Sequence, residues 1–293
     1  LRVDGPMLQG MMEMVRNGTT LYSDTGGSKD LAETVRALNT VGIRGFPGHA
    51  ILDGYLDVDA EELADPRFGS MPPDEIEKLS TPTDEAIELL RGQLEAYPFR
   101  SDRRVRCAVT LFGSGRITDR LYGEAMGLAD EFGVPMIMHQ SWGPEEVAGS
   151  LKTYGKRPIE HLADLGLLGP NLTLVHMIHL DDREVELVIE SGAGVVHCPS
   201  ASMRRGMGAI REGKHPEMLA AGVPVALGSD GYSSKRDLLR QAYLAAVVYR
   251  EVRNDIPVFT GETVLEMATL HGARVLGMAD EVGSIEVGKR ADI

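Results

Sequence analysis

The sequence lacks the cysteines, the long apolar runs and the excess of basic residues that mark several large classes of protein. Two cysteines, Cys107 and Cys198, in 293 residues make a disulfide framework unexpected and fit a reducing, cytoplasmic location. No apolar run approaches the roughly 18 residues that a membrane-spanning helix requires. A net charge of −14 argues against nucleic acids and anionic membranes as partners, since both attract clusters of Lys and Arg. An ordinary soluble protein is therefore expected, and the net charge says little about small-molecule substrates.

A dinucleotide-binding fingerprint is also missing, although strand and helix patterns alternate along the chain. No G-x-G-x-x-G follows the first predicted strand, so Rossmann-type nucleotide binding has no support. The predicted strands are nearly continuous apolar runs, typical of a parallel sheet covered on both faces; they lie at residues 19–24, 42–51, 105–112, 134–139, 172–180, 192–200 and 223–231. Seven strands, each followed by helix, fit either a (β/α)8 TIM barrel lacking one strand or an open doubly wound sheet. A long irregular acidic segment, residues 52–79, is of a kind that is usually functional.

Titratable side chains stand where four of these apolar strands stop. They are His139, His176, His197 and Asp230. In a barrel the carboxyl ends of the strands meet at one mouth, whereas in an open sheet they would be spread along an edge. Four such groups therefore favour the barrel. Imidazole and carboxylate are common ligands of a catalytic divalent metal, so His139 and Asp230 are the predicted pair of metal ligands.

Each of these residues also has a structural interpretation. A single strand-end histidine is more often a hydrogen-bonded core residue, and Asp230 in G-S-D-G has the local sequence of a turn. Structural roles are expected for three further histidines, His161, His179 and His197. His49, at the end of the second predicted strand, could line the mouth.

Several longer stretches resemble successive blocks of the amidohydrolase superfamily, in the branch of adenosine-type and triazine deaminases and chlorohydrolases. They are MVRNGTTLYSD, YGKRPIEHLADLGLLGP, LVHMIHLDD, GAGVVHCPSAS, AAGVPVALGSDGYSS and VLEMATLHGARVLGMADEVGSIEVGKRADI. The last is the most specific, because so long an ordered pattern rarely arises by chance. The resemblance implies a TIM barrel that hydrolyses carbon–nitrogen bonds other than peptide bonds. Residues 1–293 are expected to be one metal-dependent hydrolase barrel domain, cut at both ends, without barrel strand one and without the family's small β-sandwich.

The resemblance also implies residue roles. His139 matches a metal-ligating histidine, and Asp230 matches the aspartate that binds the metal and takes a proton from its water. His176 matches the histidine that contacts the substrate or the attacked centre. One divalent ion is implied, Zn²⁺ first and Fe²⁺ second, because VRCAVTLFGSG lacks the lysine that bridges two metals in binuclear members. Such an ion lowers the pKa of bound water from about 15.7 to about 7.

Two motifs of the family are absent. Its first two metal ligands form an H-x-H pair, and no H-x-H occurs in these 293 residues; the pair is expected before Leu1, or the protein lacks it. Deaminating members carry H-x-x-E after the His139 strand, where the glutamate shuttles a proton to the leaving group. Here the motif ends on Trp142, whose indole cannot carry that proton at neutral pH. Trp142 is instead predicted to bind substrate by stacking on a flat ring, while Glu145 and Glu146 are predicted to favour a helix start.

The leading hypothesis is hydrolysis of a small cyclic C–N compound by metal-activated water. The reaction would be deamination or a related displacement on a purine-, pyrimidine- or triazine-like ring. The alternative is a catalytically inactive barrel kept as a binding or structural protein, because Trp142 replaces the shuttle and H-x-H is missing. An open-sheet enzyme of another class is the third hypothesis. A homo-oligomer is expected, because helices outside such barrels commonly pack in dimers.

Overall fold

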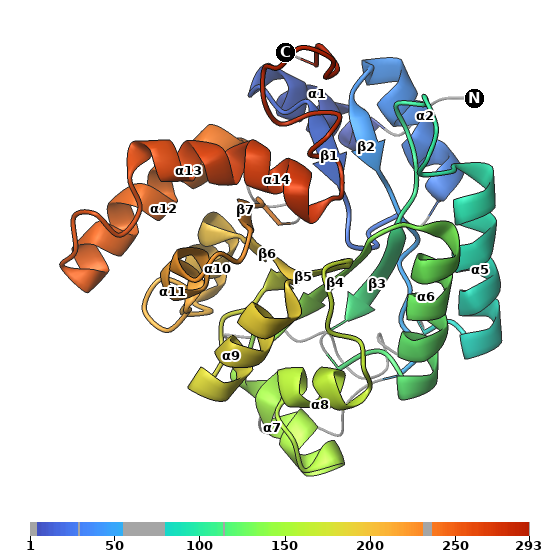
Figure 1. Cartoon of the computed structure of the whole chain (residues 1–293). Helices are drawn as coiled ribbons and strands as arrows, with labels where there is room; N and C mark the ends of the chain where they lie inside the picture. The colour runs from blue at the N-terminus through green and yellow to red at the C-terminus, as the bar shows by residue number, and fades with distance from the viewer. Residues whose placement is uncertain (1–4, 29, 55–79, 114, 231–235, 293) are drawn as a thin grey trace.

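A curved layer of parallel strands with helices on its outer face forms the fold, as the computed structural model shows for residues 5–28, 30–54, 80–113, 115–230 and 236–292 (Figure 1). The strands in this described part are β1 (Leu21–Ser23), β2 (Arg44–Phe46), β3 (Val109–Gly113), β4 (Met136–Gln140), β5 (Leu172–His176), β6 (Gly194–His197) and β7 (Val225–Leu227). Each overlaps a segment predicted to be a strand, and β3 and β4 extend one residue beyond the predicted ends. Most of the acidic segment, from residue 55 to residue 79, and the part of the G-S-D-G stretch from residue 231 lie outside the described residues.

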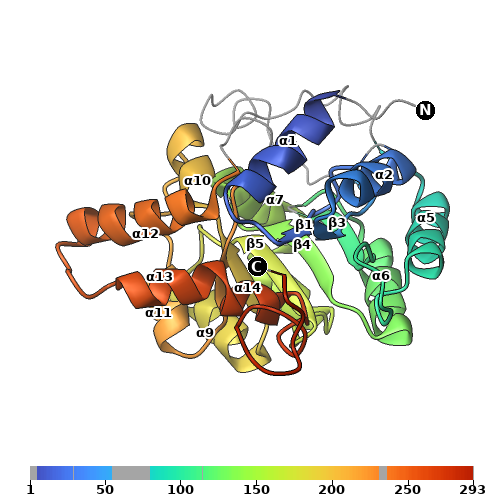
Figure 2. The same ribbon diagram turned by 90° about the horizontal axis from the view of Figure 1, so that it is seen from above.

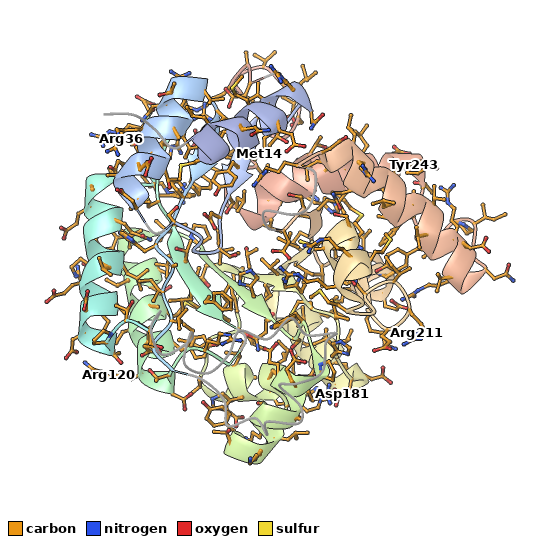
Figure 3. All side chains as sticks on the ribbon, turned by 180° about the vertical axis from the view of Figure 1, so that it is seen from behind. Met14, Arg36, Arg120, Asp181, Arg211 and Tyr243 are labelled. Atoms are coloured by element: carbon orange, nitrogen blue, oxygen red, sulfur yellow. The ribbon has the colours of Figure 1, made fainter. Side chains whose placement is uncertain are left out.

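One helix precedes β1, and helices follow every strand. They are α1 (Gly5–Arg16), α2 (Leu31–Val41), α5 (Thr83–Ala96), α6 (Asp119–Phe132), α7 (Pro144–Tyr154), α8 (Pro158–Asp164), α9 (Asp182–Ser191), α10 (Pro199–Arg205), α11 (His215–Ala220), α12 (Leu238–Arg253), α13 (Gly261–Ala268) and α14 (Leu270–Val275). Seen from above, α2, α5 and α6 lie on one side of the strands and α9 to α13 on the other (Figure 2). Exposed charged side chains such as Arg120 and Arg211 point outward from this layer (Figure 3). None of the helices in the described part is long and apolar enough to cross a membrane.

The strand order follows the chain order, which distinguishes a barrel from a doubly wound sheet. β3 to β7 pair in sequence and all in parallel, and β1 pairs in parallel with β2. The backbone of Gly45 joins the two groups of strands. Its carbonyl accepts from the Arg106 N–H and its N–H donates to the Arg104 carbonyl, with a nitrogen–oxygen distance of 3.1 Å in each bond. A doubly wound sheet would reverse direction at a switch point. The predicted TIM barrel is confirmed, and the open-sheet hypothesis is wrong.

The strands are buried as their apolar runs predict. All five residues of β5 are buried, because helices cover its outer face and other strands' side chains fill the interior. β2 is shorter than its predicted range, since Pro47 follows it and has no N–H to pair. At Gly48 an added Cβ would lie 1.8 Å from the Thr110 hydroxyl oxygen, so only glycine allows this approach to the third strand.

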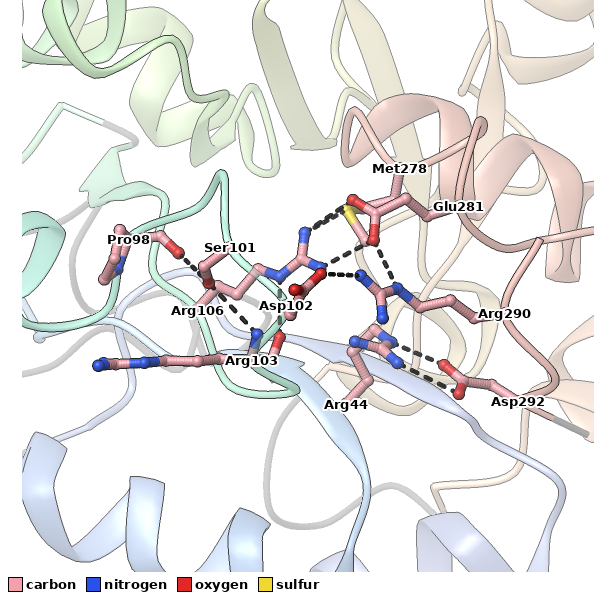
Figure 4. Close-up of polar contacts among 10 residues, drawn as sticks. All are labelled: Arg44, Pro98, Ser101, Asp102, Arg103, Arg106, Met278, Glu281, Arg290 and Asp292. Carbon is pink, nitrogen blue, oxygen red and sulfur yellow. Dashed lines mark hydrogen bonds and ion pairs between the residues drawn. The ribbon is translucent and has the colours of Figure 1, made fainter. Parts of the chain in front are cut away.

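Ion pairs fasten the segment after α14 to the amino-terminal edge of the strands (Figure 4). Both terminal nitrogens of Arg106 lie 2.8 Å from the carboxylate oxygens of Glu281, which also accepts from Arg290 Nε at 2.7 Å. Arg44 donates to Asp292 at 2.6 and 3.2 Å. The side chain of Arg106 is only 1% exposed, so its charge depends on Glu281 for compensation.

Replacing Glu281 with glutamine is expected to lower the free energy of unfolding by about 2–3 kcal/mol at pH 7, because buried Arg106 loses its counter-charge. The guanidinium of Arg106, as the largest cause, lowers the pKa of Glu281 to about 2. A lowered pKa stabilises the folded state above the unfolded value of about 4.5, and that stabilisation is lost as the pH falls toward 2. Denaturant unfolding at several pH values should therefore show the stabilities of wild type and variant converging in acid.

Exposed Glu286, paired with Lys289, is the control: Glu286→Gln should change stability by under about 0.5 kcal/mol. Equal effects of the two substitutions would contradict this account.

Candidate metal centre at the strand ends

Three of the predicted site residues meet at the carboxyl ends of the strands. His139 lies in β4, His176 ends β5, and Asp230 comes three residues after β7 ends. One nitrogen of each imidazole and one Asp230 oxygen all lie within 4.8 Å of one another. The His139 and His176 rings stack with centroids 5.3 Å apart. The barrel thus unites side chains separated by 91 positions, from 139 to 230.

The ring of His139 is held by its hydrogen bonds in one orientation. Its Nδ1 lies 2.7 Å from the main-chain carbonyl of Phe112. Because a carbonyl only accepts, Nδ1 carries the ring proton, and Nε2 presents a lone pair. The Thr25 hydroxyl lies 3.0 Å from Nε2 and can donate to it. A histidine that binds a metal through one ring nitrogen is usually oriented by a hydrogen bond from its other ring nitrogen, often to a backbone carbonyl.

Two residues at the end of β1 belong to this site and were missed by sequence reasoning. Besides Thr25, Asp24 accepts from the Tyr22 hydroxyl at 2.8 Å and from the Gly27 N–H at 2.7 Å. Burial raises the pKa of Asp24 above its usual value, and these two hydrogen bonds only partly offset it. Asp24 ends the predicted strand at 19–24 and Thr25 directly follows it, so the strand-end rule that selected His139 could also have found them.

The protonation of the cluster suits a cation. Burial lowers the pKa of His176 to about 3, so the imidazole is neutral at pH 7. Burial acts to raise the pKa of Asp230, but electrostatic interactions with its neighbours, Arg205 among them, outweigh burial and lower the pKa. Nδ1 of His176 and Oδ2 of Asp230 are buried and have no hydrogen-bond partner among the described residues. Buried polar atoms without a hydrogen-bond partner need an explanation, and two imidazoles with one carboxylate are ligand types that Zn²⁺ binds. The residues therefore fit a divalent metal.

Backbone strain is concentrated at the mouth. In the described part of the chain, five residues other than glycine have positive φ, and four of them are Ser141, His176, Met177 and Asp230. His176 has φ 83°, a left-handed conformation that costs about 1–3 kcal/mol and persists only where the surroundings impose it. The Met177 N–H donates to the Gln140 carbonyl at 3.0 Å, which holds the loop after β5 against the loop after β4.

A buried histidine from α11 fixes the backbone of His176. Nε2 of His215 lies 2.6 Å from the His176 carbonyl, and Nδ1 lies 3.0 Å from the Tyr249 hydroxyl. That hydroxyl is also 3.1 Å from the Ala209 carbonyl. His215 is fully buried, and burial lowers its pKa to about 4, so it is a neutral donor to His176. The sequence carries no signal for this pair, because both residues lie in ordinary helical patterns.

The other histidines lie outside the three-residue cluster. His197 is buried at the end of β6 and packs its ring 4.1 Å from the ring of His215. His161 bonds Asp119 at 2.8 Å and stacks on Tyr154, and His179 pairs with Glu212 at 3.3 Å. These positions agree with the structural roles predicted for the three. His49 is half-buried beyond β2, and its backbone N–H donates to the side-chain oxygen of Gln93 at 3.1 Å.

The stretch after β4 places Trp142 beside the site and gives Glu146 a role that the sequence did not reveal. The indole packs against Ile178, Met207 and Ala209. Glu146 is 3% exposed; it accepts from Gln140 Nε2 at 2.7 Å and from the Trp142 N–H at 3.1 Å. Glu145 and Glu146 do lie in the first turn of α7, as predicted. Glu146 does more than favour the helix, because it shapes the loop that carries Trp142.

Comparison with known proteins decides the family. The amidohydrolase family profile matches residues 6–293. This chain belongs to the amidohydrolase family. It is 32% identical over 284 residues to a 5-methylthioadenosine/S-adenosylhomocysteine deaminase of Syntrophobacter fumaroxidans, covering 96% of this chain and 58% of the relative. A deaminase of the same description from Halobacterium salinarum is 32% identical over 291 residues, 97% of this chain and 60% of the relative.

Solved structures of amidohydrolase-like proteins have the same fold. An adenosine deaminase from Xanthomonas campestris with bound zinc superposes with a TM-score of 0.82 at 28% identity, over 99% of this chain and 61% of that chain. An atrazine chlorohydrolase from Arthrobacter aurescens TC1 complexed with zinc superposes with a TM-score of 0.80 at 21% identity, over 99% of this chain and 64% of that chain. The chain spans about 60% of the length of these relatives.

Proposed function

We propose that residues 1–293 form the barrel domain of a metal-dependent hydrolase that deaminates the purine ring of an adenosine-type nucleoside. The observation that carries the proposal is the meeting of His139, His176 and Asp230 within 4.8 Å, with two buried polar atoms that have no hydrogen-bond partner among the described residues. Deaminases among the relatives support the choice of reaction. The bound zinc of the adenosine deaminase structure supports the choice of Zn²⁺.

His139, Asp230 and His176 would each have a different role in the reaction. His139 and Asp230 would hold the ion, which supplies a water of lowered pKa when bound. The Asp230 carboxylate would accept a proton from that water as a carbon–oxygen bond forms at the ring carbon. Neutral His176 would stabilise charge on the attacked ring by hydrogen bonding. Asp230 would return its proton to the ring nitrogen next to the attacked carbon, and the proton of the new hydroxyl would pass to the amino group as the carbon–nitrogen bond breaks. The amino group would leave as ammonia, the attacked carbon would become a carbonyl, and one water would be consumed for each ammonia released.

Trp142 is the observation that favours the alternative, a barrel that binds a ring compound without turnover. By the resemblance, it occupies the position of the glutamate that shuttles a proton in deaminating members of the family. Its position against Ile178 and Met207 supports the proposal that it lines the substrate site. The homo-oligomer and the cytoplasmic location stay predictions.

Metal content and ammonia release test the two functions together. The purified protein that carries this chain is expected to hold about one zinc per chain by elemental analysis. With adenosine, 5′-methylthioadenosine or S-adenosylhomocysteine it should release ammonia and convert the adenine absorption spectrum to that of hypoxanthine. Ring binding without ammonia release would favour the inactive barrel. A zinc-loaded protein that releases chloride from a chlorotriazine, but no ammonia from any of the three nucleosides, would reject nucleoside deamination.

A further inference from the structure

Helices α12 and α13 form an arm that reaches away from the strands (Figures 1 and 2). Of the twelve large apolar side chains that are exposed in the described part of the chain, six lie on this arm: Leu239, Tyr243, Val247, Val252, Ile256 and Leu265. Exposed apolar side chains that stand together commonly mark an interaction site, whereas single scattered ones are ordinary. The arm is therefore the strongest candidate for a contact with another protein surface.

Three of these side chains form one row along α12. Leu239, Tyr243 and Val247 follow one another at intervals of four residues, so they lie along one face of the helix, and they are 62%, 64% and 41% exposed (Tyr243 is labelled in Figure 3). The opposite face packs on the barrel, where Tyr249 is fully buried and its hydroxyl contacts His215. Apolar residues thus stand on two faces of α12, and the barrel covers only one of them. A helix that is apolar on both sides is usually buried on both sides.

Two residues of opposite charge, Arg240 and Glu251, stand at the two ends of this row. Both are exposed, and neither side chain has an ion pair or a hydrogen bond among the described residues. Arg240 precedes Tyr243 by three positions, and Glu251 follows Val247 by four. A second copy of α12 that runs antiparallel can set Tyr243 against Val247. The same register sets Arg240 against Glu251, and two-fold symmetry makes each contact occur twice.

We propose that this row is the interface of a symmetric dimer, in which the α12 helices of two copies of this chain pack antiparallel. The occupant is a second copy because the row and its two charges are complementary to themselves, as a two-fold interface requires. A parallel pair would bring Arg240 against Arg240 and Glu251 against Glu251, which like-charge repulsion disfavours. Tyr243, near the two-fold axis, is an aromatic side chain of the kind enriched in the cores of interfaces. Such a dimer gives the predicted homo-oligomer a defined surface, whatever reaction the barrel catalyses.

Exchanging the two charges tests the antiparallel register directly. Arg240→Glu makes both charges of the row negative, and Glu251→Arg makes both positive, so each variant alone opposes like charges and its dimer Kd should rise at least about tenfold. An equimolar mixture of the two variants should form the mixed dimer, because every opposed pair then has opposite signs. The double variant Arg240→Glu/Glu251→Arg should recover a Kd within about threefold of wild type. Sedimentation over a concentration series gives the Kd, and native mass spectrometry with copies of different mass identifies the mixed dimer.

Leu239→Glu tests the apolar part of the row. It places a charge where the partner helix would exclude water, so the dimer Kd should rise about 100-fold or more. The matched control is Leu151→Glu, the same change at an exposed leucine of α7 that is 45% exposed, which should leave the Kd within about twofold. Both variants should keep the circular dichroism spectrum of wild type, because both side chains are exposed.

The purified protein that carries this chain should sediment as a dimer at micromolar concentration. A wild type that stays monomeric up to its highest soluble concentration would overturn the interface, as would a dimer that survives Leu239→Glu. Charge variants that dimerise alone as well as they do together would overturn the antiparallel register. A monomer in which Tyr243 is protected from hydroxyl-radical labelling would show that another part of the same protein covers the row. None of these measurements uses a substrate, so a failure of the proposed deamination leaves their outcome unchanged.

Discussion

Asp230→Asn is expected to abolish turnover while leaving the chain folded. The amide has the same shape as the carboxylate but cannot accept a proton from water, so kcat should fall by about 10³-fold or more. It is also a weaker ligand for a hard cation, and the metal affinity should fall by at least about tenfold. The fold should survive, because Oδ2 of Asp230 makes no hydrogen bond among the described residues that the substitution could break.

The measurement combines elemental analysis after dialysis, steady-state ammonia release and thermal unfolding. Asp237→Asn is the matched control, because it makes the same chemical change seven positions away. Asp237 caps α12 by accepting from the Arg240 N–H, and asparagine caps a helix about as well. Wild-type activity in Asp230→Asn, or a loss of metal equal to that of the control, would refute the proposed role of Asp230.

Replacing His215 with leucine is expected to lower kcat/KM by about 10–100-fold, although His215 touches no substrate. Metal affinity should fall as well, because the ring of His176 stacks on the ring of the proposed ligand His139, with centroids 5.3 Å apart. His215 is a positioning residue: its Nε2 donates at 2.6 Å to the carbonyl of His176, which has a strained left-handed backbone. Without the donor, the buried carbonyl is left unpaired, which also costs about 1–3 kcal/mol of stability. The His176 ring would then lose its fixed position beside His139 and Asp230.

His215→Gln separates positioning from simple destabilisation, because its side-chain amide can still donate to the His176 carbonyl. It should recover most of the metal affinity that leucine loses. Tyr249→Phe, which removes only the hydroxyl near Nδ1, should have a smaller effect. Nitrogen-15 NMR should show a neutral His215 ring with a slowly exchanging Nε2–H, a signature independent of activity. A folded His215→Leu protein with unchanged metal affinity and kcat/KM would rule out the positioning role.

The strand-end histidines and the aspartate show which site residues a local sequence pattern can predict. His139, His176 and Asp230 each end or follow an apolar run, and the sequential parallel fold brings such ends together. That rule also covers Asp24 and Thr25, although they were not selected. It fails for His215, because this residue reaches the site from a helix, and helical periodicity predicts only that it is buried. Glu146 was assigned to the helix dipole for the same reason: its contacts with Gln140 and the Trp142 N–H depend on the path of a loop.

The sequence by itself determined the alternation of strands and helices, the family and the side chains at the strand ends. The alternation and the strand-end positions follow from periodicity, which acts over a few residues, whereas the family follows from the resemblance of longer stretches to known blocks. Only the tertiary structure decided that three of the four strand-end groups form one cluster, that His197 packs against His215 instead, and that Arg205 faces Asp230. Such contacts join residues tens of positions apart, and their geometry depends on strand register, loop path and backbone strain. For Trp142, the sequence identified the missing proton shuttle, and the fold placed the indole against Ile178 and Met207 beside the site.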